Sequence, residues 1–164
     1  MDKKLIIFFL LLLIVISSVM LISFKPYRAK QPITVPLQTN ATKFKTLTIS
    51  DKSLRVEYAS TLAEWSKGLS NRISLEKDNG MIFVFPTAQI QNFWMKDTII
   101  PLDIIWVANH KVVGFDHMFP ELDTPIEQLK HFYSPSAVDV VIETNLNWTI
   151  SNNIKIGDVV TYSN

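Results

Sequence analysis

Cysteine is absent from this chain of 164 residues, and that absence excludes several kinds of chemistry. The protein can form no disulfide, no thiolate metal site and no cysteine nucleophile. Glycine is also scarce, with four residues in the whole chain. The sequence contains no glycine-rich phosphate loop and no Gly-x-Ser-x-Gly nucleophile motif. These absences leave no recognisable catalytic signature, and they predict no cofactor.

A strong charge of one sign is absent as well. The 16 Lys and Arg residues nearly balance the 15 Asp and Glu residues, which gives a formal net charge of +1. Proteins that bind nucleic acid usually carry a basic patch or stripe that neutralises phosphates. We therefore predict no nucleic-acid partner.

Long hydrophobic runs are absent except at the N-terminus. Residues 5–22 are apolar apart from two serines, and two lysines precede them. Such a stretch can cross a hydrocarbon core of ~30 Å as a helix, at ~1.5 Å per residue. A cleaved signal peptide has a shorter apolar region of ~7–15 residues and a small-residue cleavage site, which is poorly matched here. We predict that residues 1–23 form an uncleaved signal anchor, a single transmembrane helix.

The flanks of this segment bear on its orientation. Two lysines precede it, and Lys25, Arg28 and Lys30 follow it, so the positive-inside rule gives nearly a tie. A short N-terminal tail is easily retained in the cytoplasm, and we expect the C-terminal domain to lie outside it. Residues 24–43 contain three prolines among polar residues, which predicts an extended spacer. The domain itself is predicted to span residues 44–164.

Most of this domain has the pattern of short β-strands. Residues 47–49 and 54–58 alternate apolar and polar side chains, and residues 81–85 are apolar on both faces. Pro86 is expected to end the latter strand, because proline cannot donate to a sheet ladder. Further strands are predicted at 93–96, 102–107, 111–115 and 137–143, followed by a strand pair at 154–158 and 159–162.

Two short helices are also predicted. Thr61 and Glu64 have the spacing of a capping box before an apolar stripe of Leu62, Trp65 and Leu69, and Gly68 is placed to end that helix. A second helix, capped by Thr144, is suggested by Leu146 and Ile150. The predicted fold is a mainly β, small barrel-like domain with two short helices.

Several motifs of this domain resemble one known family. They are Gly68-Leu69, Gly80-Met81-Ile82-Phe83-Val84-Phe85, Phe93-Trp94-Met95-Lys96-Asp97-Thr98, Pro101-Leu102-Asp103-Ile104, Val141-Ile142-Glu143 and Ile154-Lys155-Ile156-Gly157-Asp158. The chain is identified on these motifs as a member of the DUF192 (UPF0127) family over roughly residues 45–162. The resemblance implies a small β-rich, barrel-like domain that is often membrane-anchored or exported. It implies no established activity.

A polar and aromatic cluster provides the candidate site. Its members lie among apolar strands, and the candidate ligand-binding residues are Arg72, Trp94, Lys96, Asp97, Thr98 and Asp103. Asp103 is expected to face the same side of its strand as Ile105 and Val107. A carboxylate buried there needs a cation, for which Arg72 and Lys96 are the candidates. Two interpretations remain open, a charged binding pocket and a structural ion pair.

The segment 116–136 offers an alternative site. It has three prolines and no regular period, which predicts a long and functional loop. A metal site could draw on His117, His131, Asp116, Glu121 and Asp123, and Ser134 and Ser136 lie near His131 as nucleophile candidates. No spacing matches a known metal-ligand motif, which favours solvated loop side chains.

Two functional hypotheses follow. The first is a non-enzymatic, membrane-anchored β-domain that binds a small ligand or a cell-envelope protein through the Trp94–Asp103 region. The second is an extracytoplasmic hydrolase or metal-assisted enzyme that uses Asp and His residues of segment 116–136. The missing catalytic motifs favour the first hypothesis.

Overall fold

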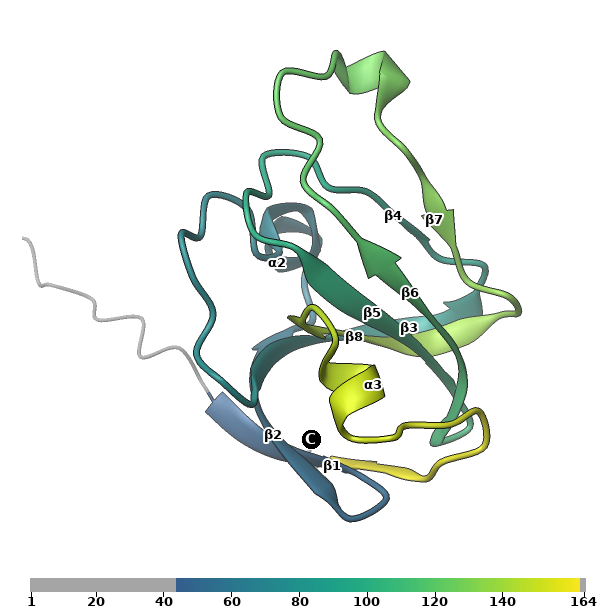
Figure 1. Ribbon diagram of the computed structural model, residues 1–164. Helices are drawn as coiled ribbons and strands as arrows, with labels where there is room; N and C mark the ends of the chain where they lie inside the picture. The colour runs from purple at the N-terminus through teal and green to yellow at the C-terminus, as the bar shows by residue number, and fades with distance from the viewer. Residues whose placement is uncertain (1–43, 163–164) are drawn as a thin grey trace, which may run out of the picture. The chain divides into compact units, whose positions relative to one another are not determined.

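The computed structural model describes residues 44–162, which fold into a strongly curved β-sheet with two short helices (Figure 1). The strands are β1 (Phe44–Ile49), β2 (Lys52–Ala59), β3 (Asn79–Gln89), β4 (Asn92–Phe93), β5 (Leu102–Ala108), β6 (Lys111–Met118), β7 (Phe132–Tyr133), β8 (Val138–Asn145) and β9 (Val160–Tyr162). The helices are α2 (Leu62–Lys67), α3 (Trp148–Ser151) and the 3-10 turn η1 (Ile126–Gln128). The mainly β, half-barrel fold with two short helices is confirmed.

Seven strands form the main sheet, in the order β6-β5-β8-β3-β2-β1-β9. All neighbours are antiparallel except β2 and β3, which run parallel. The two edge strands approach each other where Lys111 pairs with Val159 and the Val112 N–H donates to the Asp158 carbonyl at 2.9 Å. The sheet therefore curls almost into a barrel, as Figure 1 shows.

Two hydrophobic clusters lie on opposite faces of this sheet. The first fills the concave interior and includes Leu47, Ile82, Ile105 and Trp148, the last from α3. Figure 1 shows α3 inside the curve of the sheet. The second cluster covers the outer face, where Met81, Phe83, Ile104, Trp106 and Val141 meet Phe132 of the small β4-β7 ribbon.

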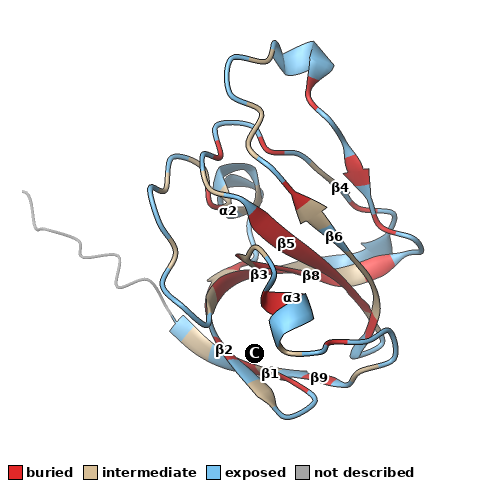
Figure 2. Cartoon of the chain, viewed as in Figure 1, coloured by how far each residue is buried: buried red, intermediate tan, exposed pale blue. Residues whose placement is uncertain are grey.

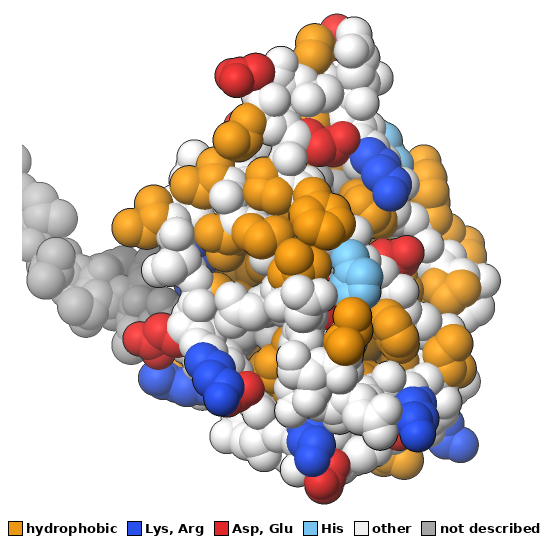
Figure 3. Space-filling model, in the orientation of Figure 1, with side chains coloured by type: hydrophobic (Ala, Val, Ile, Leu, Met, Phe, Trp, Pro, Cys, Tyr) orange, Lys and Arg blue, Asp and Glu red, His pale blue; other side chains and the backbone are white. Residues whose placement is uncertain are grey.

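The central strands are apolar on both faces because both faces are covered. Six consecutive residues of β5 are buried, and most of β8 is buried too (Figure 2). The prediction of a doubly covered strand at residues 81–85 is confirmed for its first three residues, Met81, Ile82 and Phe83, which are buried, whereas Val84 and Phe85 are half-buried. On the face seen in Figure 3, charged side chains of both signs are interspersed with apolar side chains.

The structure confirms the predicted ends of the first helix but not the predicted packing of Leu62. Thr61 and Glu64 form the capping box, and Gly68 ends α2 with a φ of 45°. Leu62 does not pack on the sheet, since it is 77% exposed. Trp65 alone of the helical residues anchors α2, because its Nε1 donates to the Ala59 carbonyl at 3.1 Å.

Further expectations about elements are wrong. Residues 154–158, predicted as a strand, form a loop with a turn. Strand β3 does not end at Pro86 but continues to Gln89, because its register with β8 shifts between Val84 and Gln89 and no ladder bond is needed at the proline. The second helix begins after Asn147 rather than Thr144. Segment 116–136 is not one loop, since β6 extends to Met118 and η1 and β7 follow.

The predicted signal anchor and spacer, residues 1–43, lie outside the described residues. Within residues 44–162 no helix has the length and apolar character that a membrane crossing requires.

Candidate ligand-binding site

A pocket of about 530 Å³ lies on the outer face of the sheet, between α2, β3 and the segment that follows β4. Five aromatic side chains line it together with polar and charged residues. Trp65 and Phe85 are in tilted contact with ring centroids 4.8 Å apart, and Phe83 and Phe93 meet edge to face at 5.0 Å. Trp94 lies at the mouth and is 44% exposed. A pocket of this size and lining is suited to a small organic ligand.

One side of the pocket is closed by the turn at residues 95–98. The Lys96 carbonyl accepts hydrogen bonds from the hydroxyls of Ser70 at 3.1 Å and Thr98 at 3.2 Å. The Asp97 carbonyl accepts from the Asn71 N–H at 2.7 Å. The turn thus docks on the segment after α2 through its backbone. The side chains of Lys96 and Asp97 remain at the surface and pair with each other at 2.8 Å.

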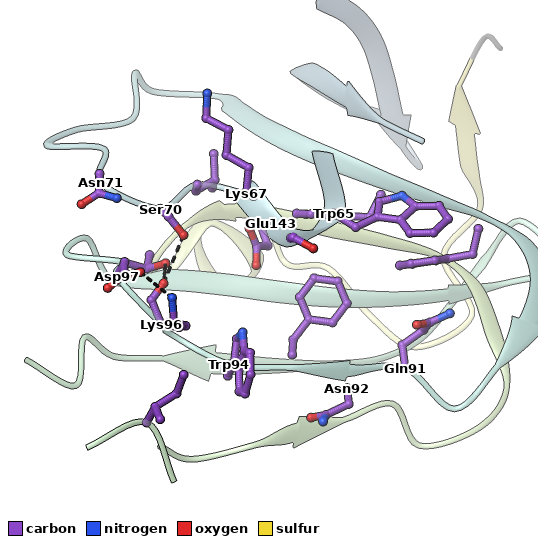
Figure 4. A pocket seen from close by; sticks show the side chains of 18 residues that line it. Trp65, Lys67, Ser70, Asn71, Gln91, Asn92, Trp94, Lys96, Asp97 and Glu143 are labelled. Carbon is purple, nitrogen blue, oxygen red and sulfur yellow. Dashed lines mark hydrogen bonds and ion pairs between the residues drawn. The ribbon is translucent and has the colours of Figure 1, made fainter. Parts of the chain in front are cut away.

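Glu143 is the carboxyl group that lines this pocket from the sheet (Figure 4). It sits in the middle of β8, opposite Met81 of β3 and Ile104 of β5, and it is 5% exposed. Among the described residues, none forms a hydrogen bond or ion pair with its carboxyl group. Burial raises the pKa of Glu143 to about 8. The group is therefore mostly a neutral acid at pH 7, and it can both donate and accept a hydrogen bond.

A second polar group in the same pocket lacks a partner. The Nε2 amide of Gln91 is buried without a hydrogen bond within residues 44–162. The backbone of Gln91 is fixed by Ser134, whose hydroxyl accepts from the Gln91 N–H at 2.9 Å and whose N–H donates to the Gln91 carbonyl at 3.0 Å. Buried polar groups in native proteins are nearly always paired, so these two groups stand out among the buried polar side chains of residues 44–162.

The structure brings together four of the six predicted site residues. Trp94, Lys96, Asp97 and Thr98 line the pocket, whereas Arg72 and Asp103 do not. Arg72 instead forms a bidentate ion pair with Glu57 on the outer face of β2. That pair fastens the segment after α2 to the sheet.

The expected ion pair of Asp103 with Arg72 or Lys96 is wrong. Asp103 is fully buried on the concave side, as its alternation with Ile105 predicted, but its partners come from β6 and α3. It accepts from His117 Nδ1 at 2.7 Å, from the backbone N–H groups of Asn147 and Thr149 at 2.9 and 2.8 Å, and from the Thr149 hydroxyl at 2.6 Å. Asp103 therefore holds α3 inside the curved sheet.

Side chains of the alternative site serve local structure. Asp116 accepts from Trp106 Nε1 at 2.8 Å, Glu121 accepts from the Lys130 N–H at 2.9 Å, and His131 is bonded to Asn92 at 2.9 Å. The Ser134 hydroxyl donates to the Ser136 carbonyl at 2.8 Å. Across residues 44–162, His, Asp and Glu side chains form no group of three that could hold a metal ion.

Sequence reasoning did not select Glu143 and Gln91 as site residues. Glu143 occupies an alternating strand, where a polar residue usually faces solvent. Glu143 lies on the same strand face as Val141, next to a strand predicted to be covered on both faces. That position could have identified Glu143 as a buried residue. Gln91 gives no such signal, because a polar residue after a strand is normally exposed.

Comparison with known proteins gives the fold but no activity. The DUF192 family model, described as "Uncharacterized ACR", matches residues 45–162. A protein of unknown function from Novosphingobium aromaticivorans DSM 12444 has a similar structure, with 28% identity, a TM-score of 0.68 and coverage of 76% of this chain and 89% of that chain. A putative transcription regulator from Sinorhizobium meliloti 1021 shares the fold at 23% identity and a TM-score of 0.66, over 74% of this chain and 95% of that chain. No curated protein matches.

Proposed function

This chain belongs to the DUF192 family of uncharacterised proteins, and we propose that its domain is a module that binds a small organic ligand in the Glu143 pocket. The observation that carries the proposal is the unpartnered carboxyl group of Glu143, buried among aromatic walls. The aromatic rings supply apolar contact area, and Glu143 supplies a polar anchor. This combination is typical of small-molecule sites.

The energetic cost of Glu143 supports a role in binding. A buried carboxyl group without a partner destabilises its ionised form strongly, and a glutamine or an apolar residue would avoid that cost. Residues that reduce stability in this way are frequent where a ligand completes their interactions. By contrast, Asp103, another buried acid, is surrounded by hydrogen-bond donors and needs no ligand.

Binding rather than catalysis is the activity that the pocket supports. The hydroxyl groups of Ser70 and Thr98 in the pocket donate to the Lys96 carbonyl and not to a histidine or carboxylate. An activated hydroxyl nucleophile needs such a base within hydrogen-bond distance. The side chains of the alternative site in segment 116–136 serve strand and turn contacts instead.

We also propose that the binding module is tethered to a membrane by residues 5–22 and lies outside the cytoplasm, with residues 24–43 as spacer. The apolar length and the weak cleavage pattern support this proposal. Protease added to intact cells should remove an epitope placed at the C-terminus, and the anchored protein should retain its N-terminus. A protected epitope, or mature protein that begins after Ser18 or Ser23, would contradict the proposal.

The binding proposal is tested with a panel of small aromatic and alicyclic fragments, each as a neutral, an amine and a carboxylate analogue. Saturation-transfer NMR on the full chain in detergent should detect at least one fragment that binds. Trp94→Ala should weaken that fragment about tenfold, because an aromatic wall is removed.

Tyr133→Ala is the matched control. Tyr133 is 59% exposed, and like Trp94 it contacts the ring of His131, but it does not line the pocket. Its removal should leave fragment binding unchanged. The proposal is wrong if no fragment binds, or if both substitutions weaken binding equally.

A further inference from the structure

We propose that the ligand of this pocket carries an organic ammonium ion, with the Glu143 carboxylate as its counter-charge and the aromatic rings as its walls. This inference rests on the proposed binding function and names the class of ligand. It follows from the charges that face the pocket, from the character of its walls and from the protonation of Glu143.

The charged groups around the pocket favour a cation at its base. Besides Glu143, the titratable side chains that line it are Lys67 of α2 and Lys96 and Asp97 of the turn after β4, and β3 contributes none. Lys96 is neutralised by its ion pair with Asp97 at 2.8 Å. Figure 4 shows the ammonium group of Lys67 pointing away from Glu143. Within residues 44–162, no cation therefore neutralises the buried carboxyl group.

The walls favour a cation that is poorly hydrated and apolar on its outside. Trp65, Phe83, Phe85, Phe93 and Trp94 all line the same pocket. The faces of aromatic rings attract cations through their quadrupoles, and quaternary ammonium ions are recognised in this way because they lose little hydration on binding. An aromatic pocket without an acid would suit a neutral ligand equally well. The buried acid is what distinguishes the two classes.

Protonation of Glu143 gives the inference a measurable consequence. Burial raises the pKa of this group to about 8, so in the free protein at pH 7 it holds a proton. An ammonium ion favours the ionised carboxylate, and its binding must therefore displace that proton. Affinity for the cation should rise with pH through this range and level off above it.

The experiment compares choline with 3,3-dimethylbutan-1-ol, which has the same shape with a carbon in place of the charged nitrogen. Binding of each to the full chain in detergent is measured by titration calorimetry or by NMR. Choline should bind about tenfold more tightly than the alcohol at pH 9. Between pH 7 and pH 9 choline affinity should rise about tenfold, while the affinity for the alcohol stays constant.

Glu143→Gln keeps the shape of the side chain and removes its charge. This variant should lose the choline preference and the rise with pH, and it should bind the neutral alcohol as the wild type does. Glu76→Gln is the matched control, because it makes the same chemical change at an exposed glutamate that does not line the pocket. It should change choline affinity by less than about twofold, as expected for a surface charge.

The results separate this inference from the binding function on which it rests. Equal affinity for choline and the alcohol, or unchanged choline binding by Glu143→Gln, overturns the ammonium inference and leaves a pocket for neutral ligands. Failure of choline to bind also overturns it, and the neutral members of the fragment panel then decide whether the pocket binds ligands at all. Equal losses of choline affinity in Glu143→Gln and Glu76→Gln would show that the effect comes only from general surface electrostatics, and would overturn the inference.

Discussion

At the scale of single residues, two buried acids differ in whether their carboxyl groups have hydrogen-bond partners. Asp103 is buried on the concave side, where His117, two backbone N–H groups and a threonine hydroxyl surround it. Glu143 is buried on the outer side with no partner among the described residues. A satisfied carboxylate stabilises its surroundings, whereas an unsatisfied one destabilises the fold in its ionised form. The first group therefore belongs to the scaffold and the second to the site.

The raised pKa of Glu143 predicts how stability depends on pH. Its pKa rises on folding from 4.5 to about 8, so the folded state holds this proton more tightly than the unfolded state. The contribution of Glu143 to stability is most favourable below pH 4.5, declines as pH rises from there to about 8, and is constant above that. The total decline is on the order of 5 kcal/mol, from ~1.4 kcal/mol per pKa unit.

Glu143→Gln should remove this decline and be more stable than the wild type at pH 9. Urea unfolding of both proteins between pH 5 and pH 9 measures how the free energy of unfolding of each depends on pH. Asp139→Asn, a change in the same strand at a half-buried position outside the pocket, is the control and should keep the wild-type decline. Parallel pH profiles for wild type and Glu143→Gln would show that Glu143 is solvated in the folded protein.

Asp103→Asn should destabilise the domain by about 3 kcal/mol, because buried N–H donors lose a charged acceptor and His117 loses its partner. Asp116→Asn is a matched change on the neighbouring strand β6. Asp116 is exposed, and an asparagine oxygen can still accept the hydrogen bond from Trp106 Nε1, so its cost should stay below about 1 kcal/mol. Denaturant unfolding compares them, and equal small losses would contradict the role of Asp103 in holding α3.

At the scale of elements, the site depends on how closely β3 and β8 approach. Gly80 of β3 pairs with Thr144 of β8, next to Glu143. A Cβ atom at Gly80 would lie 2.4 Å from the Glu143 carbonyl oxygen, which is far inside van der Waals contact. Glycine at this position therefore allows the strand that carries Glu143 to pair with its neighbour.

Gly80→Ala should cost about 2–3 kcal/mol, since the clash involves backbone that cannot move aside easily. Gly157→Ala is the comparison, because a Cβ there would meet nothing within 4 Å and only the φ of 95° opposes it. That change should cost about 1 kcal/mol. Thermal unfolding measures both, and a smaller loss for Gly80→Ala than for Gly157→Ala would show that β3 and β8 separate without penalty.

At the scale of the whole molecule, one sheet separates two hydrophobic clusters that have different structural roles. The concave cluster closes the half-barrel through α3 and the approach of β9 to β6. The outer cluster supports α2 and the β4-β7 ribbon, and the pocket lies among these covering segments. The candidate pocket is therefore formed between these covering segments and the outer face of the sheet.

This arrangement predicts that a fragment of residues 44–164 folds alone. All core residues of both clusters lie within it, so it should be soluble and unfold in one cooperative transition. A fragment that begins at residue 52 lacks β1, which joins β2 to β9 and carries the fully buried Leu47 and Ile49, and it should not fold. Calorimetry of both fragments is the measurement. Absence of a transition in the longer one would mean that the preceding residues belong to the fold.

The sequence by itself determined the class of the domain and many of its local features. Alternation and apolar runs placed the central strands, and the Thr61–Glu64 spacing gave the ends of α2, because these features depend on neighbours within a few residues. The family motifs likewise lie in continuous stretches. Alternation also placed Asp103 on the concave side of its strand.

Only the tertiary structure decided which polar groups meet. The partners of Asp103 lie 14 to 46 residues away in sequence, and no local pattern distinguishes His117 from Arg72 or Lys96 as the one within reach. Glu143 is a site residue because α2 and the β4-β7 ribbon cover its face of the sheet, and a strand pattern cannot say what covers a face. Its burial, its raised pKa and its place in an aromatic pocket all come from that long-range packing.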